Sequence, residues 1–218
     1  MPVRVGILDS GLPASHGWVI CEARNFVGDA DAVIDRLGHG SGVLETIGSS
    51  DAEVEFCIAR IFDDRLSTDT SACAAAIEWL VGLAPRLVNL SFGLRRNDDR
   101  LREACELAVA QGIGLVAASP AQGDPVFPAA YSGVVRATGD ARCDRNETAF
   151  LGSEQADFGG WVGDSRVGPA GASIGCASVS GRLVRLAAGC PDAPFENLVD
   201  KLKGSAEYRG VERKGRPL

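Results

Sequence analysis

Three short segments of the chain carry side chains whose types suit nucleophilic catalysis. Asp9 ends an apolar run, His39 stands between two glycines, and Ser173 follows Gly171-Ala172 at the start of an apolar stretch of helical pattern. A nucleophilic serine needs a base that takes its proton and an acid that orients this base and stabilises its charged form. A serine at a helix N-terminus also lies near free backbone N–H groups and the positive end of the helix dipole, which suit an oxyanion. The three residues are therefore candidates for a catalytic triad.

Each segment alone also has an ordinary structural explanation. An acid at a strand end is most often a turn former or a helix cap, and a serine after glycine at a helix start is usually just a cap. A histidine between glycines is rarely a core residue, because glycine gives its ring nothing to pack against. It is the occurrence of all three, in the order Asp, His, Ser, that favours catalysis.

Short apolar strands alternate with helical stretches along the chain. The hydrophobic pattern predicts strands at 3–8, 54–61, 87–90, 113–118 and 134–138, and helices at about 70–83, from Asp98 or Asp99 to Gly112, and at 173–188. This alternation indicates an open, mostly parallel α/β sheet. Such sheets bind ligands beyond the carboxyl ends of their strands. Asp9, Ser91 and Ser119 each follow a predicted strand end, so we expect them near the site.

Composition and charge exclude several classes of protein. The 218 residues are 45% hydrophobic and 23% charged, which is typical of a globular chain and not of a disordered or fibrous one. No apolar run approaches the roughly 20 residues that a membrane span requires. The net charge of −7 argues against nucleic acid or an anionic membrane as the main partner. The N-terminus lacks the features of a signal peptide. We therefore expect one domain over 1–218 without a pro-domain, ending in a flexible tail at about 204–218.

The cysteines predict neither a metal site nor disulfides. Seven of them are scattered at positions 21, 57, 73, 105, 143, 176 and 190, none in a C-x-x-C pattern, and the chain has only two histidines. An odd number of single cysteines in apolar stretches is typical of small buried thiols in a reducing compartment. The expectation is a cytoplasmic protein with no metal and no cofactor.

Taken in order, the three segments resemble those of the subtilisin-like serine proteases, and the resemblance covers nearly the whole chain. Residues 9–11 resemble the family's Asp-[Ser/Thr]-Gly segment, and residues 39–43 resemble its His-Gly-Thr-His-Val segment. Residues 171–181 resemble its Gly-Thr-Ser-Met-Ala-x-Pro-His-Val-x-Gly segment. The family segments between these three are matched by residues 52–62, 77–79 and 88–93. The resemblance implies a minimal three-layer α/β fold, a mostly parallel β-sheet flanked by helices. It also implies a serine endopeptidase in which Asp9 orients His39, His39 serves as base and then acid, and Ser173 attacks the peptide carbonyl.

The same resemblance implies a peptide-binding cleft that pairs with the substrate backbone, so that side-chain pockets set selectivity. Ser91-Phe92-Gly93 match one of the two substrate-binding segments, and Leu66 and Ser67 fall in the other. Ala117, Ala118 and Ser119 would border the pocket for the residue before the cleaved bond. The alternative interpretation of residues 91–93 is that they only connect a strand to the following loop and do not bind substrate.

The chain also departs from the family pattern, most clearly at the oxyanion hole. The family has Ala-Ala-Gly-Asn after the fourth strand, and here Ala121 stands at the position of the asparagine that donates to the oxyanion. Gln122 is the nearest amide, and the backbone N–H of Ser173 is the other expected donor. The loop that carries a calcium site in many relatives is reduced to 48–51, and Pro-His has become Ala177-Ser178.

These features favour an intracellular serine endopeptidase of narrow specificity over a digestive enzyme. The expected substrate is a leader-bearing precursor of a ribosomally made, modified peptide or subunit, and the modifying enzyme is a further expected partner. The alternative is a catalytically impaired fold of the same family that serves as a peptide-binding or scaffold protein. A non-proteolytic α/β protein, such as a phosphate-binding one, is disfavoured because the chain has neither a P-loop nor a G-x-G-x-x-G fingerprint.

Overall fold

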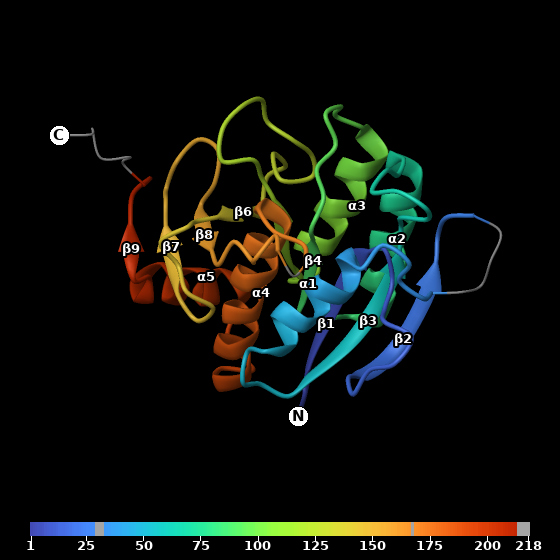
Figure 1. Ribbon diagram of the computed structural model, residues 1–218, viewed down its shortest axis with the longest axis horizontal. Helices are drawn as coiled ribbons and strands as arrows, with labels where there is room; N and C mark the ends of the chain where they lie inside the picture. The colour runs from blue at the N-terminus through green and yellow to red at the C-terminus, as the bar shows by residue number, and fades with distance from the viewer. Residues whose placement is uncertain (29–32, 167, 213–218) are drawn as a thin grey trace.

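A sheet of nine strands forms the centre of the computed structural model, which describes residues 1–28, 33–166 and 168–212 (Figure 1). The strands are β1 (Val3–Asp9), β2 (Val19–Asn25), β3 (Val54–Arg60), β4 (Leu87–Leu90), β5 (Gly114–Ala118), β6 (Val134–Gly139), β7 (Thr148–Phe150), β8 (Phe158–Gly160) and β9 (Tyr208–Arg209). Their spatial order is β2-β3-β1-β4-β5-β6-β8-β7-β9. All neighbours are parallel except β7 and β8, which confirms the mostly parallel sheet.

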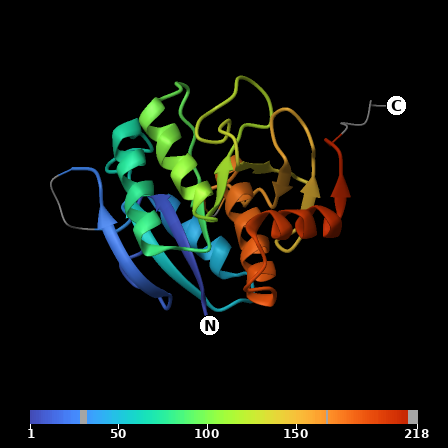
Figure 2. The same ribbon diagram turned by 180° about the vertical axis from the view of Figure 1, so that it is seen from behind.

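Helices cover both faces of this sheet, as the front and back views show (Figures 1 and 2). They are α1 (His39–Gly48), α2 (Thr70–Leu83), α3 (Asp99–Ala110), α4 (Ala172–Gly189) and α5 (Phe195–Ser205). One apolar core joins α1 and α4 to the sheet, and a second joins α2 and α3 to its other face. This arrangement confirms the three-layer α/β fold.

Helix α4 is buried over most of its length, as its apolar pattern predicts. Leu183 and Val184 are fully buried among residues of the sheet and of α1. Burial of such a side chain contributes about 1.5–3 kcal/mol. The helix that carries Ser173 at its start is therefore fixed by the core of the protein.

Capping residues set the start of the two helices on the other face. Asp69 accepts a hydrogen bond from the Ala72 N–H at 2.7 Å, and Asp98 accepts one from the Leu101 N–H at 3.0 Å. A side-chain cap of this kind contributes about 1 kcal/mol to helix stability. The predicted helices at 70–83 and from Asp98 are thereby confirmed.

Two glycines allow the helices with the candidate catalytic residues to approach the sheet closely. A Cβ atom at Gly40, the second residue of α1, would lie 2.4 Å from the carbonyl oxygen of Gly11. A Cβ atom at Gly175 in α4 would lie 2.2 Å from the carbonyl oxygen of Thr138. Both distances are too short for any side chain, so these positions require glycine.

The C-terminal segment differs from its expected structure. Helix α5 continues to Ser205, and Tyr208 and Arg209 form β9, which pairs with β7. Helix and strand structure thus extends to Arg209, beyond the start of the flexible tail expected from about 204, while 213–218 lie outside the described residues.

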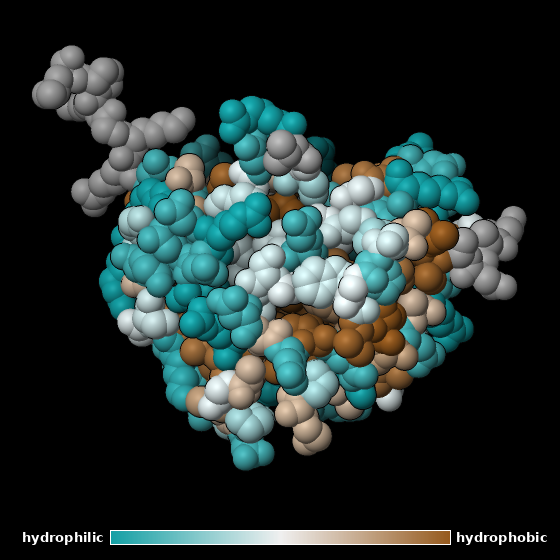
Figure 3. Space-filling model, turned by 60° about the horizontal axis from the view of Figure 1, so that its bottom comes forward, coloured by the Kyte–Doolittle hydropathy of each residue, from teal (hydrophilic) through white to brown (hydrophobic). Residues whose placement is uncertain are grey.

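The surface is mainly polar on the face that Figure 3 shows, with hydrophobic residues grouped near its centre. No helix in the described part of the chain is both long and apolar enough to cross a membrane.

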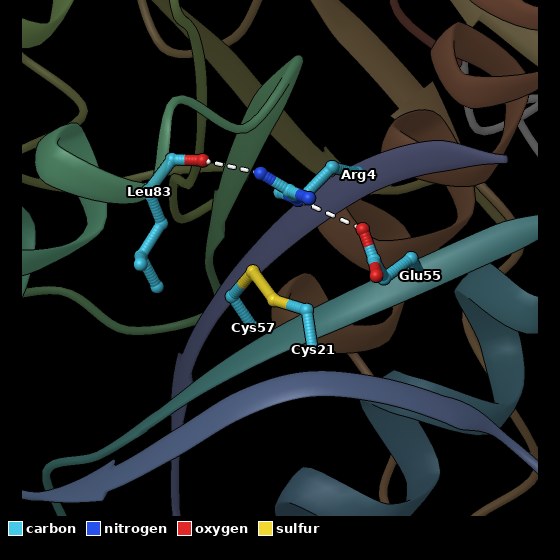
Figure 4. The surroundings of a disulfide bond; sticks show 5 residues. All are labelled: Arg4, Cys21, Glu55, Cys57 and Leu83. Atoms are coloured by element: carbon cyan, nitrogen blue, oxygen red, sulfur yellow. Dashed lines mark hydrogen bonds and ion pairs between the residues drawn. A yellow bond between two sulfur atoms is a disulfide. The ribbon is translucent and has the colours of Figure 1, made fainter. Parts of the chain in front are cut away.

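The cysteines correct another expectation, because Cys21 and Cys57 form a disulfide (Figure 4). The bond joins the edge strand β2 to β3, at a point where the pairing register shifts between Ile20 and Glu22. Such a bulge redirects the side chain that it contains, here that of Cys21. Beside it, Arg4 donates to Glu55 at 2.8 Å and to the carbonyl oxygen of Leu83 at 2.9 Å.

The other five cysteines are free thiols, four of them buried. Burial raises the pKa of four of these thiols to about 12, in Cys73, Cys105, Cys143 and Cys176. They stay protonated at neutral pH and act as small apolar side chains.

The disulfide predicts a stability that depends on redox conditions. The bond closes a loop with a sequence separation of 36 residues. A loop of this length contributes about 2–4 kcal/mol, chiefly by restricting the unfolded chain. We expect a reductant to lower the Tm of the parent protein in thermal unfolding.

Cys21→Ser should show the lowered Tm without reductant and no further response to it. Cys190→Ser, which alters a free cysteine, should respond to reductant as the parent does. An unchanged Tm of the parent under full reduction, checked by thiol counting in mass spectrometry, would contradict a stabilising bond.

Candidate active site

The carboxyl ends of β1 and β4 and the N-terminal ends of α1 and α4 meet beside one cleft. The cleft has a volume of about 360 Å³. It is lined by His39, Phe62, Leu66, Ser67, Thr68, Ser91, Phe92, Gly93, Leu94, Arg95 and Ser173. The position agrees with the rule that parallel α/β sheets place their sites beyond the carboxyl ends of strands.

Asp9 and His39 form a direct hydrogen bond at this cleft. The distance between His39 Nδ1 and Asp9 Oδ1 is 2.7 Å. The side chain of Asp9 is fully buried, whereas the His39 side chain is 12% exposed at the cleft. The second oxygen of Asp9, Oδ2, has no hydrogen-bond partner among the described residues. The carboxylate thus holds the imidazole in one orientation.

A second acid, Asp35, fixes the start of the helix that carries His39. Its Oδ1 accepts from the Ser10 hydroxyl at 2.7 Å and from the Leu37 and Gly38 N–H groups, both at 2.9 Å. Its Oδ2 accepts from the Ser41 N–H at 2.8 Å and from the Ser41 hydroxyl at 2.7 Å. Burial favours the neutral form of Asp35, but these hydrogen bonds outweigh it and lower the pKa of the carboxyl.

Ser10 connects the two acids. Its oxygen accepts from the Gly40 N–H at 2.9 Å, and it lies 3.2 Å from Asp9 Oδ1. Sequence reasoning missed Asp35 because its partners lie on several segments. The available signal was an acid four residues before the histidine, close to the start of the helix.

The environment of His39 favours its charged form. Burial opposes the imidazolium, but the hydrogen bond and charge of Asp9, together with the charge of Asp35, outweigh this effect. The pKa of His39 is therefore raised above its ordinary value. A base with a raised pKa becomes protonated at a higher pH as the solution is acidified.

Ser173 forms a reciprocal pair of hydrogen bonds with Ser91. The Ser173 hydroxyl donates to the carbonyl oxygen of Ser91, and the Ser91 hydroxyl donates to the carbonyl oxygen of Ser173, both at 2.9 Å. The Ser173 hydroxyl thus points to Ser91 and not to His39. Transfer of its proton to His39 requires a rotation of the side chain, as is common in sites without substrate.

Asn89 supports this pair from inside the core. Its amide donates to the Ser91 hydroxyl at 2.8 Å, and its side-chain oxygen accepts from the Ser180 hydroxyl at 3.0 Å. The Cys176 thiol lies 3.3 Å from the same oxygen. These contacts join β4 to two turns of α4. The sequence signal for this network was a single asparagine inside an otherwise apolar strand.

The predicted substrate-binding residues, together with the predicted oxyanion donor Gln122, separate into two groups. One group lines the cleft together with His39 and Ser173 and consists of Leu66, Ser67, Ser91, Phe92 and Gly93. The other group does not line it and consists of Ala117, Ala118, Ser119 and Gln122. Ala117 and Ala118 are buried in β5, where they face the two apolar cores.

Ser119 and Gln122 lie at other cavities. The Ser119 hydroxyl donates to the carbonyl oxygen of Gln155 at 2.6 Å, in a cavity of about 380 Å³. Gln122 is exposed and lines a cavity of about 730 Å³ with Thr138 and Gly139. The structure therefore does not place the Gln122 amide in the cleft, and its role as an oxyanion donor stays a prediction.

Within the described residues, no group of three or more His, Cys, Asp or Glu side chains is arranged to hold a metal ion. The expectation of a site without metal or cofactor stays a prediction.

Comparison with known proteins identifies relatives, although no family model matches the chain. The chain is similar to subtilisin DY of Bacillus licheniformis, with 29% identity over 164 residues, or 68% of this chain. It is also similar to a thermostable alkaline protease of Halalkalibacterium halodurans, with 24% identity over 194 residues, or 84% of this chain. The aligned parts are 60% and 51% of these two relatives.

Solved structures show the same fold. A cold adapted subtilisin-like serine proteinase superimposes with a TM-score of 0.74 and 19% identity, covering 93% of this chain and 81% of that one. The nisin leader peptidase NisP from Lactococcus lactis superimposes with a TM-score of 0.65 and 16% identity, covering 91% of this chain and 81% of that one. These likenesses confirm the subtilisin-like fold.

The surroundings of His39 predict the direction of its titration. We expect NMR to give a pKa for His39 above the ordinary value of about 6.5, because Asp9 and Asp35 stabilise its charged form. Asp9→Asn should lower this pKa, since it removes the nearest negative charge, and Asp35→Asn should lower it less. The other histidine, His16, is exposed and serves as an internal reference. A His39 pKa that Asp9→Asn leaves unchanged would contradict the described contact.

The buried network predicts that Asn89 is important for stability. Asn89→Ala leaves the Ser91 and Ser180 hydroxyls with one partner fewer and should lower the free energy of unfolding by about 1–3 kcal/mol. Urea denaturation measures this change. Asn97→Ala, at an exposed position before α3, is the matched control and should stay within about 0.5 kcal/mol of the parent. Equal stability of the two variants would show that the network contributes nothing.

Proposed function

Because this chain resembles the subtilisin-like serine proteases in sequence and shares their fold, we propose that it is a serine endopeptidase with Asp9, His39 and Ser173 as its catalytic residues. The observation that carries the proposal is the 2.7 Å hydrogen bond between His39 and buried Asp9, at a cleft that Ser173 also lines. An acid that orients a histidine beside a serine is the arrangement that acyl transfer by serine requires.

The reaction follows from the roles of these groups. The Ser173 hydroxyl oxygen attacks the peptide carbonyl carbon while His39 takes its proton, and the Asp9 carboxylate stabilises the imidazolium that results. His39 then gives the proton to the leaving amine, and the C–N bond breaks. A water molecule, deprotonated by His39, hydrolyses the ester on Ser173 and restores the free enzyme.

The anionic oxygen that develops during attack needs hydrogen-bond donors. Ser173 lies in the first turn of α4, where backbone N–H groups have no partners within the helix. The Ser173 N–H is therefore the donor that we propose, supported by the positive end of the dipole of α4.

The cleft supports binding of an extended peptide. Residues 66–68 and 91–95 contribute most of its lining, and their backbone groups suit strand addition. Apolar side chains lie among them, with the rings of Phe62 and Phe92 6.4 Å apart and Leu66 55% exposed. We propose that these pockets select apolar side chains of the substrate.

The biological substrate that we propose is a leader-bearing precursor peptide or protein. The likeness to the nisin leader peptidase NisP supports leader removal. Within that class the sequence resembles the small protease that removes a leader in the maturation of quinohemoprotein amine dehydrogenase. The modifying enzyme of the precursor is the second partner, and the net charge of −7 disfavours nucleic acid and anionic membranes.

The cellular location of this activity stays a prediction. The scattered cysteines led us to expect the cytoplasm, but the Cys21–Cys57 disulfide is typical of oxidising compartments and counts against it.

A second candidate function is that of a peptide-binding protein with little or no activity. Two observations favour it: Ala121 replaces the asparagine of the family, and the Ser173 hydroxyl is bonded to Ser91 and not to His39. Such a protein would bind peptides in the same cleft without cleaving them.

The proposal predicts a large loss of activity when either proton-transfer partner is removed. Ser173→Ala and His39→Ala should each lower kcat on a peptide substrate by about 10⁴–10⁶-fold, because nucleophile and base act as a unit. Asp9→Asn should lower kcat by about 10⁴-fold, since it leaves His39 without its counter-charge. Cleavage is followed by mass spectrometry of the products.

Ser71→Ala, at an exposed position on α2, should match the parent and controls for protein quality. Cleavage by Ser173→Ala at the rate of the parent would refute the protease assignment. Binding of the peptide by the parent without any cleavage would support the second candidate function.

A further inference from the structure

A further cavity lies between α1, α4 and the loop before β7. It has a volume of about 100 Å³ and shares no lining residue with the cleft. Its lining consists of Thr46, Ser49, Ser50, Arg145, Asn146, Trp161, Ser178, Gly181, Arg182 and Arg185. Three guanidinium groups and four hydroxyl groups thus surround a small space.

Carboxylates balance the positive charges around the cavity only in part. Arg145 stacks on the Trp161 ring, 4.0 Å from its centroid, and forms no ion pair with an acidic side chain among the described residues. Arg182 pairs with Glu207 at 3.1 Å and also donates to the carbonyl oxygen of Asn146. Arg185 lies 3.8 Å from Asp51, an exposed and therefore weak ion pair. The cavity consequently has an excess of positive charge.

Two buried hydroxyl groups add neutral donors to these cations. Ser50 is 8% exposed, and its hydroxyl oxygen is buried with no hydrogen-bond partner among the described residues. Ser178 is 4% exposed, and its hydroxyl oxygen accepts from the backbone N–H of Trp161 at 3.3 Å, so its own proton is free to be donated. A buried hydroxyl without a partner destabilises a protein, which indicates that the Ser50 hydroxyl has a partner in solution.

The volume of the cavity suits a small partner. A water molecule takes about 30 Å³ in the liquid, so the cavity is equivalent to about three waters. Pockets for drug-sized molecules are at least several times larger. A carboxylate group fits the space but offers only two oxygens to the five donor side chains, whereas a tetrahedral oxyanion offers four.

We propose that this cavity is a binding site for a small tetrahedral oxyanion of the phosphate or sulfate type. The planar guanidinium groups of Arg145 and Arg185 can each donate two hydrogen bonds to such an ion. Arg182, which also donates to Asn146 and Glu207, has further N–H hydrogens for it. The hydroxyls of Ser50 and Ser178 donate to its remaining lone pairs. The site requires no part of the proposed protease activity.

The position of the site predicts its effect on the protein. Helices α1 and α4, which lie side by side in Figure 1, begin at the cleft with His39 and with Ala172-Ser173, and the cavity lies further along both of them. An anion held by Ser50 and by the arginines of α4 connects the end of α1 to α4. Because the unfolded chain lacks this site, binding stabilises the native state by mass action.

The test is thermal unfolding and calorimetric titration of the whole chain with inorganic phosphate. Phosphate in the low millimolar range should raise Tm by about 2–4 °C, a shift that saturates, and sodium sulfate should act similarly. Sodium chloride at the same ionic strength should give no such rise. Millimolar concentrations keep the general stabilisation of proteins by these salts negligible.

Variants assign the effect to the cavity. Arg145→Gln should weaken phosphate binding at least tenfold, because it removes the arginine without an acidic partner. Arg24→Gln is the matched control, since Arg24 is an exposed arginine that also stacks on an aromatic ring, that of Phe26. Ser50→Ala should raise or preserve Tm without phosphate and reduce the phosphate-dependent rise.

Three results would overturn the proposal. They are a Tm that does not respond to phosphate or sulfate, a rise that chloride produces equally, and a rise that Arg145→Gln and Arg24→Gln retain to the same extent. The proposal stands independently of catalysis, because Ser173→Ala should bind phosphate as the parent does.

Discussion

The hydrogen bond between buried Asp9 and His39 is the interaction on which the rest of the site depends. The negative charge of a carboxylate that is buried away from solvent must be stabilised by the groups around it. His39 can stabilise the charge of Asp9 only if α1 begins directly beside the end of β1. Gly40 permits this approach, and Asp35 and Ser10 bind the first N–H groups of the helix. The same contacts that hold α1 against β1 therefore also position the proposed catalytic pair.

The second half of the site is positioned from the core. Ser173 begins a helix that the sheet and α1 bury on several sides, and Ser91 binds it through two hydrogen bonds. Asn89 extends this contact into the interior. The nucleophile is thus held by a rigid element and a polar network, while its hydroxyl needs only a side-chain rotation to reach the base. This combination suits a site whose working geometry forms when substrate binds.

The sequence predicted those features that are encoded locally. Apolar runs identified strands such as β1, β3 and β4, a helical pattern identified α2, and a cap at Asp98 or Asp99 identified α3. It missed β2, whose alternating polar side chains resemble a loop, and β7, β8 and β9, which have two or three residues each. Asp35, Asn89 and the Cys21–Cys57 pair depend on contacts between distant segments, which one sequence does not reveal. Ala117 and Ala118 were expected at a pocket, but their strand is central, so both of its faces are covered.

Active-site labelling with a fluorophosphonate tests the central claim most directly, because only a serine activated by its base reacts readily with such a probe. Intact-mass and peptide-mapping spectrometry of the labelled protein locate the adduct. The proposed arrangement predicts one adduct, on Ser173, in the parent and none in His39→Ala. A parent protein that stays unlabelled, or that carries the adduct on a different serine, would contradict it.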